Sequence, residues 1–131
     1  MRLLPVFGVA MSILGSVIAG AAEHTTESLE TVKQQLAQGK AVIVDVRESS
    51  EWDEGHLKDA RLLSLSRLRK GVSPEELDKI LTKDKVIYAH CAAGGRCLEA
   101  ADRLKKAGFE IRPLKPGFRD LLAAGFEKAQ E

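Results

Sequence analysis

Hydrophobic positions along the chain follow two alternating patterns. Short apolar runs predict strands, and apolar residues that recur every three or four positions predict helices. The predicted strands cover residues 41–46, 61–65, 86–90 and 110–114. The predicted helices cover residues 29–38, 49–54, 74–81, 97–107 and 117–124. Because strands and helices alternate, we expect an α/β fold, with a parallel β-sheet flanked by helices on both faces.

The helix over 74–81 has the clearest start signal. Ser73 is suited to cap it, Pro74 occupies the first helical position, and Glu76 lies three residues after the cap. Two other predicted helices end at glycines, Gly39 and Gly108.

The amino terminus differs from the rest of the chain. After Met1 and Arg2, residues 3–22 carry no charge, and small residues at 19–22 fit a cleavage site. We therefore expect a secretory signal peptide at residues 1–22, one domain at 23–131, and a periplasmic or secreted protein. The alternative is an uncleaved anchor, in which case the chain contacts the membrane only through this segment.

Composition excludes several other classes. A formal net charge of +1 gives no electrostatic basis for a nucleic-acid partner. Two cysteines and three histidines without a paired spacing argue against zinc, so we expect no metal. We also expect no cofactor. A chain of 131 residues fits one domain, and we expect a monomer.

The segment from Val86 to Cys97 carries the strongest chemical signal. Its apolar run ends in Cys91, and two glycines and an arginine follow before a helical pattern begins. Gly94 and Gly95 allow the chain to curl so that backbone amides point inward, and the next helix directs its positive end to the same place. These features favour the thiolate of Cys91, which is the nucleophilic form.

The residues that follow Cys91 are the predicted substrate-binding set. They are Ala92, Ala93, Gly94, Gly95 and Arg96. Arg96 adds a cation that suits an oxyanion of sulfur or phosphorus, although a salt bridge to Glu99 is its alternative role. Four residues separate Cys91 from Arg96, one fewer than in cysteine phosphatases. The tighter loop fits one extra sulfur atom on the cysteine better than a phosphoryl group.

Motifs on both sides of this loop resemble the single-domain rhodanese family. They are Asp45-Val46-Arg47, Trp52, Gly55-His56-Leu57, Leu114-Lys115-Pro116-Gly117 and Ala124-Gly125-Phe126. The resemblance covers residues 26–126 and implies a rhodanese-like fold and a Cys91 persulfide. Pro116, Leu121 and Asp59 depart from the family pattern at positions that concern packing and turns.

Charged and histidine residues near the loop are assigned supporting roles. Asp45 and Arg47 lie at the carboxyl end of a predicted strand, where we expect a buried ion pair that braces the loop. His90 precedes Cys91 in an extended strand, so the two side chains point to opposite faces and direct proton transfer is not expected. The family resemblance implies that His56, within Gly55-His56-Leu57, ties loops together by hydrogen bonds.

Cys97 follows the loop arginine, where rhodanese and phosphatase loops often place Ser or Thr. Its thiol is therefore expected near Cys91. It could act as a passive S–H donor to the Cys91 thiolate, which we prefer, or attack a Cys91 persulfide and close a disulfide.

Together these residues predict a sulfurtransferase. It would move a sulfane sulfur from a small anionic donor such as thiosulfate to a thiophilic acceptor, either cyanide or a thiol, through covalent catalysis at Cys91. Two alternatives stay open. The chain could be a thiol–disulfide redox protein that uses Cys91 and Cys97, or a rhodanese-like module that binds a partner without turnover.

Overall fold

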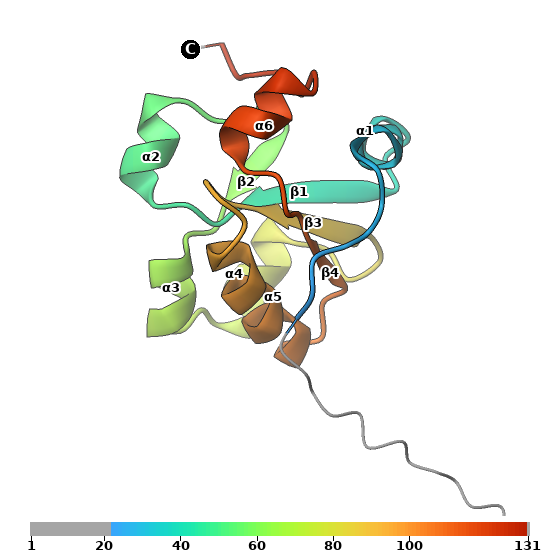
Figure 1. The fold of residues 1–131 in the computed structure, drawn as a ribbon. Helices are drawn as coiled ribbons and strands as arrows, with labels where there is room; N and C mark the ends of the chain where they lie inside the picture. Colours follow the sequence, from blue (N-terminus) through green and yellow to red (C-terminus); the bar gives the residue numbers. More distant parts are fainter. Residues whose placement is uncertain (1–21, 131) are drawn as a thin grey trace, which may run out of the picture.

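The computed structural model describes residues 22–130, which contain a four-stranded parallel sheet in the order β2-β1-β3-β4 (Figure 1). The strands are β1 (Ala41–Asp45), β2 (Ala60–Leu62), β3 (Val86–His90) and β4 (Ile111–Pro113). The central strands β1 and β3 pair along their whole length, and this register places Asp45 opposite His90. Parallel pairing brings the carboxyl ends of both strands to the same edge of the sheet, where sites of α/β proteins form.

Helices cover both faces of this sheet, with α3, α4 and α5 on one side and α1 and α6 on the other (Figure 1). The helices are α1 (Leu29–Ala37), α2 (Ser49–Glu54), α3 (Leu65–Lys70), α4 (Pro74–Ile80), α5 (Arg96–Lys106) and α6 (Phe118–Ala123). The predicted parallel α/β fold with helices on both faces is therefore confirmed.

The sheet divides the buried side chains into two clusters. Val44 packs in the cluster on the α3–α5 side, together with Leu104. Its neighbour in the strand, Ile43, packs in the other cluster with Leu121 of α6. Successive side chains of a strand point to opposite faces, which is why one continuous apolar run supplies both clusters.

One predicted strand is wrong in its second half. The run 61–65 was expected to be extended, but β2 ends at Leu62 and Leu65 begins the unpredicted helix α3. The Ser64 side chain accepts a hydrogen bond from the Arg67 amide, so it caps the new helix. Other differences are small, such as a β4 shorter than the predicted 110–114.

The amino-terminal part of the described chain runs beside α5 and β4 before α1 begins (Figure 1). The Ala22 amide donates to Asp102 at 2.7 Å, and the Thr25 amide donates to the Pro113 carbonyl at 2.8 Å. The predicted signal segment, 1–22, lies outside the described residues apart from Ala22. Across 22–130, no helix has the length and apolar character needed to cross a membrane.

Candidate active site

Strand β3 delivers Cys91 to the loop that precedes α5. The Cys91 side chain is buried, with 1% of the residue exposed. Gly94 turns the loop at a φ of +88°, and a Cβ there would lie 2.6 Å from the Lys115 carbonyl oxygen. Both observations require glycine at position 94, as the sequence predicts.

The sulfur of Cys91 is surrounded by hydrogen-bond donors. The Gly94 amide lies 3.1 Å from Sγ. A hydrogen bond from the Cys97 thiol, together with donation from the amides of Cys97, Ala93 and Gly94, outweighs burial and lowers the pKa of Cys91 to about 5. Cys91 is therefore a thiolate at neutral pH, which is the nucleophilic form of the residue.

Cys97 lies under the loop as its thiol partner. It is fully buried, and its Sγ lies 3.2 Å from the Gly94 carbonyl and 3.3 Å from the Leu114 carbonyl. The hydrogen bond to Cys91 and burial both raise the pKa of Cys97, so it keeps its proton. Neither cysteine forms a disulfide in this structure. The passive-donor role of Cys97 stays a prediction.

Arg96 is held by a residue that the sequence did not single out. Its guanidinium donates to both carboxylate oxygens of Glu51 on α2, at 2.6 and 2.9 Å. The alternative pairing with Glu99 is wrong, because Glu99 binds Arg69 and Arg103 instead. The bond to Arg96 is the main reason why the pKa of Glu51 falls to about 2.

Asp45 and Arg47 form the buried ion pair that the sequence predicts. The closest contact, from the Arg47 guanidinium to Oδ2, is 2.8 Å, and the same nitrogen donates to the Gly55 carbonyl at 2.8 Å. His90 Nε2 lies 3.7 Å from Asp45 Oδ2 and forms no hydrogen bond within the described part of the chain, and burial lowers the pKa of His90. The ion pair thereby ties the end of β1 to the turn after α2.

His56 also connects segments, as expected. Its Nδ1 donates to the Trp52 carbonyl at 3.0 Å, and the two rings stack with centroids 3.6 Å apart. The His56 carbonyl accepts from the Ala129 amide, which joins the turn after α2 to the carboxyl-terminal segment.

Two contacts to the loop come from distant parts of the chain and were missed by sequence reasoning. Gly117, at the start of α6, lies so close that a Cβ would be 1.7 Å from the Ala92 carbonyl oxygen, and the Phe118 amide donates to the Cys91 carbonyl at 2.9 Å. His24 Nε2 lies 2.6 Å from the Gly94 carbonyl, so this nitrogen donates. The glycine of the closing motif was the only sequence signal for either contact.

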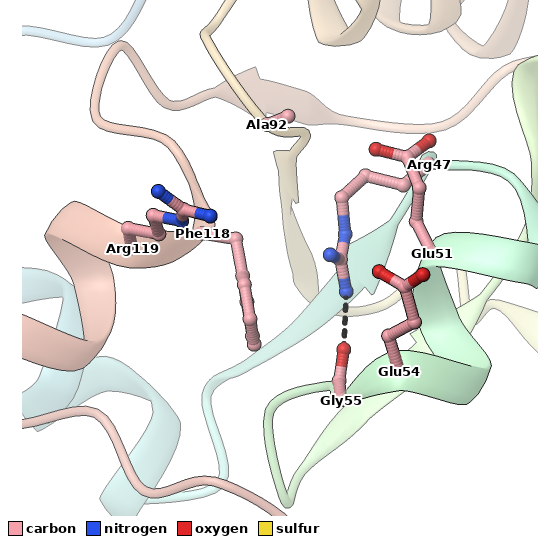
Figure 2. A pocket seen from close by; sticks show the side chains of 7 residues that line it. All are labelled: Arg47, Glu51, Glu54, Gly55, Ala92, Phe118 and Arg119. Carbon is pink, nitrogen blue, oxygen red and sulfur yellow. Dashed lines mark hydrogen bonds between the residues drawn. The ribbon is translucent and has the colours of Figure 1, made fainter.

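A pocket of about 510 Å³ opens beside the loop, between α2 and α6 (Figure 2). It is lined by Arg47, Glu51, Glu54, Gly55, Ala92, Phe118 and Arg119. Figure 2 shows Phe118 and Arg119 on one side and the two glutamates on the other. Ala92, the residue after the nucleophile, connects the pocket to the loop, and among residues 22–130 no cluster of side chains is suited to hold a metal ion.

Comparison with curated proteins finds relatives that share this region. The chain is 40% identical over 81 residues to the uncharacterized protein YqhL of Bacillus subtilis (strain 168). The matched region covers 61% of this chain and 60% of YqhL. It is 36% identical over 92 residues to the "Probable adenylyltransferase/sulfurtransferase MoeZ" of Mycobacterium tuberculosis (strain CDC 1551 / Oshkosh), covering 70% of this chain and 22% of MoeZ. The chain thus spans only part of both relatives.

Solved structures share the fold, and a family model matches most of the sequence. The human single-domain sulfurtransferase TSTD1 superposes with a TM-score of 0.65 at 24% identity, over 77% of this chain and 97% of that one. The rhodanese-like domain of the Anabaena protein Alr3790 gives 0.64 at 26% identity, over 80% and 78%. Since the model of the rhodanese-like domain matches residues 28–124, the chain belongs to the rhodanese-like domain family.

Proposed function

We propose that the protein is a sulfurtransferase that carries sulfane sulfur as a persulfide on Cys91. The observation that carries this proposal is the Cys91 thiolate, buried in a short loop and stabilised by the amides of Ala93, Gly94 and Cys97. The same donors that stabilise a thiolate can stabilise a persulfide anion, which places its charge one atom further out. Family membership and the relative named as a sulfurtransferase support the proposal.

The proposed cycle has two displacements at sulfur. The Cys91 thiolate attacks the outer sulfur of thiosulfate, the S–S bond of thiosulfate breaks, and sulfite leaves with the bonding electron pair. Cyanide or a thiolate then attacks the outer sulfur of the persulfide, and Cys91 leaves again as a thiolate. A leaving thiolate with a low pKa favours this second step, and the cycle needs no cofactor.

The proposal includes export. The uncharged segment 3–22 with its small-residue cleavage pattern supports a periplasmic or secreted protein, with residues 23–131 as its rhodanese-like domain. Fractionation of cells that express the full chain tests this part. Recovery of the uncleaved chain from the cytoplasm would contradict it, and recovery from the membrane fraction would favour the anchor.

Intact-protein mass after incubation with thiosulfate tests the transfer itself. The chain should gain one sulfur atom, lose it again on addition of cyanide with release of thiocyanate, and gain nothing in Cys91→Ser. A thiol–disulfide redox protein would instead lose two hydrogen atoms under mild oxidant without an adduct, and a pure binding module would do neither. The redox alternative rests on the presence of a second buried free cysteine, Cys97, beneath the loop that holds Cys91.

A further inference from the structure

Most of the charge around the nucleophile is already neutralised by ion pairs. Arg47 is bound to Asp45, and both side chains are buried. Arg96 is bound to both carboxylate oxygens of Glu51. Neither guanidinium is therefore free to bind a ligand unless an existing pair is broken.

Two oppositely charged side chains on the wall of the pocket lack such partners among residues 22–130. Arg119 on α6 and Glu54 on α2 both line the pocket and are both exposed. Within residues 22–130, neither side chain forms an ion pair or a hydrogen bond. They extend from opposite sides of the pocket, and Ala92 of the nucleophile loop lies at its edge (Figure 2).

We propose that this pocket selects an acceptor thiol that carries both a carboxylate and an ammonium group. Arg119 binds the carboxylate, Glu54 binds the ammonium, and the thiol points to the sulfur on Cys91. This inference rests on the proposed sulfur transfer and defines the acceptor of that same site. A pocket of about 510 Å³ is large enough for a small amino-acid thiol.

The pairing of charges favours a zwitterion over simpler thiols. A thiol with only a carboxylate gains the attraction of Arg119 but is repelled by Glu54, and a thiol with only an ammonium group meets the reverse. A zwitterion gains both attractions. Each exposed pair is worth a small amount, so the expected discrimination is about two- to fivefold for each charge.

The transfer step balances without an oxidant. The acceptor thiolate attacks the outer sulfur of the Cys91 persulfide, a new S–S bond forms, and the bond between the two sulfurs on Cys91 breaks. The acceptor becomes a persulfide and Cys91 recovers its thiolate. The proton of the acceptor thiol passes to solvent.

A single-turnover experiment separates acceptor choice from loading. The full chain is loaded with thiosulfate, desalted, and shown by mass to carry one sulfur atom. Loss of that atom is then followed with three acceptors: free cysteine, 3-mercaptopropionate and cysteamine. Each transfer rate is divided by the rate at which the same thiol reacts with a small disulfide in solution, which corrects for differences in thiol reactivity. The wild-type chain should prefer free cysteine about two- to fivefold over each of the other two.

Two variants assign the preference to its residues. Arg119→Gln should remove the preference over cysteamine, and Glu54→Gln should remove the preference over 3-mercaptopropionate. Lys105→Gln and Asp53→Asn change the net charge by the same amounts outside the pocket, and both should keep the wild-type pattern.

Equal normalised rates for all three thiols, or preferences that survive both pocket variants, would overturn the inference. Failure to load sulfur overturns the proposed function and the inference with it, and is recognised by mass before any acceptor is added.

Discussion

Arg96 and Glu51 form an ion pair with two hydrogen bonds, which joins the nucleophile loop to α2. The pair is about one-third exposed, so solvent competes for both groups. An anionic donor that uses Arg96 has to displace Glu51 first. The pair therefore opposes the binding of thiosulfate in the resting structure.

This competition predicts the effect of Glu51→Gln. Removing the carboxylate charge should raise kcat/KM for thiosulfate about two- to fivefold, since a partly exposed pair is worth roughly 0.2–1 kcal/mol. Arg96→Ala should lower it roughly ten- to a hundredfold, the loss expected for a charge-assisted hydrogen bond of about 1.5–3 kcal/mol. Glu99→Gln is the control, because Glu99 pairs with Arg69. If Glu51→Gln instead lowers the rate as Arg96→Ala does, the pair positions the loop and does not compete with the donor.

Cys97→Ala should raise the pKa of Cys91, because the Cys97 thiol is the largest of the donors that lower it. Alkylation by iodoacetamide follows the thiolate, so its pH profile should move from a midpoint near 5 toward higher pH. Cys97→Ser keeps a hydrogen-bond donor, and we expect it to shift the profile less and to keep most transferase activity. An unchanged midpoint in Cys97→Ala would show that the backbone amides alone stabilise the thiolate.

Gly117→Ala should destabilise the domain and impair the loop. The added methyl would lie 1.7 Å from the Ala92 carbonyl oxygen. That oxygen belongs to the backbone, so it cannot move aside as the end of a flexible side chain can. We expect a loss of about 1–3 kcal/mol or more in the free energy of unfolding, measured in urea. Gly95→Ala is the matched control, since its methyl would meet no atom of the described residues within 4 Å. Equal midpoints for the two variants would contradict the close contact.

Asp45→Asn should be among the most destabilising single changes near the site. It leaves the buried Arg47 guanidinium without its charged partner, which costs about 3–5 kcal/mol for pairs of this kind. Glu127→Gln breaks an exposed pair with Lys58 and should cost about 1 kcal/mol or less. Urea unfolding of both variants measures the difference. Equal effects would mean that the Asp45 pair contributes no more than a surface pair.

The parts of the site that are local in sequence could be predicted, and the parts that join distant segments could not. Gly94 follows Cys91 closely, so the chemistry of the turn is visible in the residue types. Glu51 lies 45 positions from Arg96, and His24 lies 70 positions from Gly94. One sequence without a fold does not show which of many charged residues meets a given loop.

The same distinction explains the fold. The strands β1 and β3 were predicted because continuous apolar runs are typical of a covered parallel strand. The run 61–65 misled because a leucine-rich stretch fits a strand or a buried helix equally well. Ser64 decides the outcome by capping α3, and this local hydrogen bond competes with extension of the sheet.

The opposite pKa shifts of Cys91 and Cys97 also fix how many protons their oxidation would release. Above about pH 5 the pair holds one proton, which stays on Cys97 while Cys91 is a thiolate. Closing a bond between these two sulfurs would remove two electrons but only one proton. The midpoint potential of such a couple falls by about 30 mV per pH unit, half the slope of about 59 mV for an ordinary pair of thiols. A given change in pH would therefore shift the midpoint potential of this cysteine pair only half as far as that of a conventional dithiol.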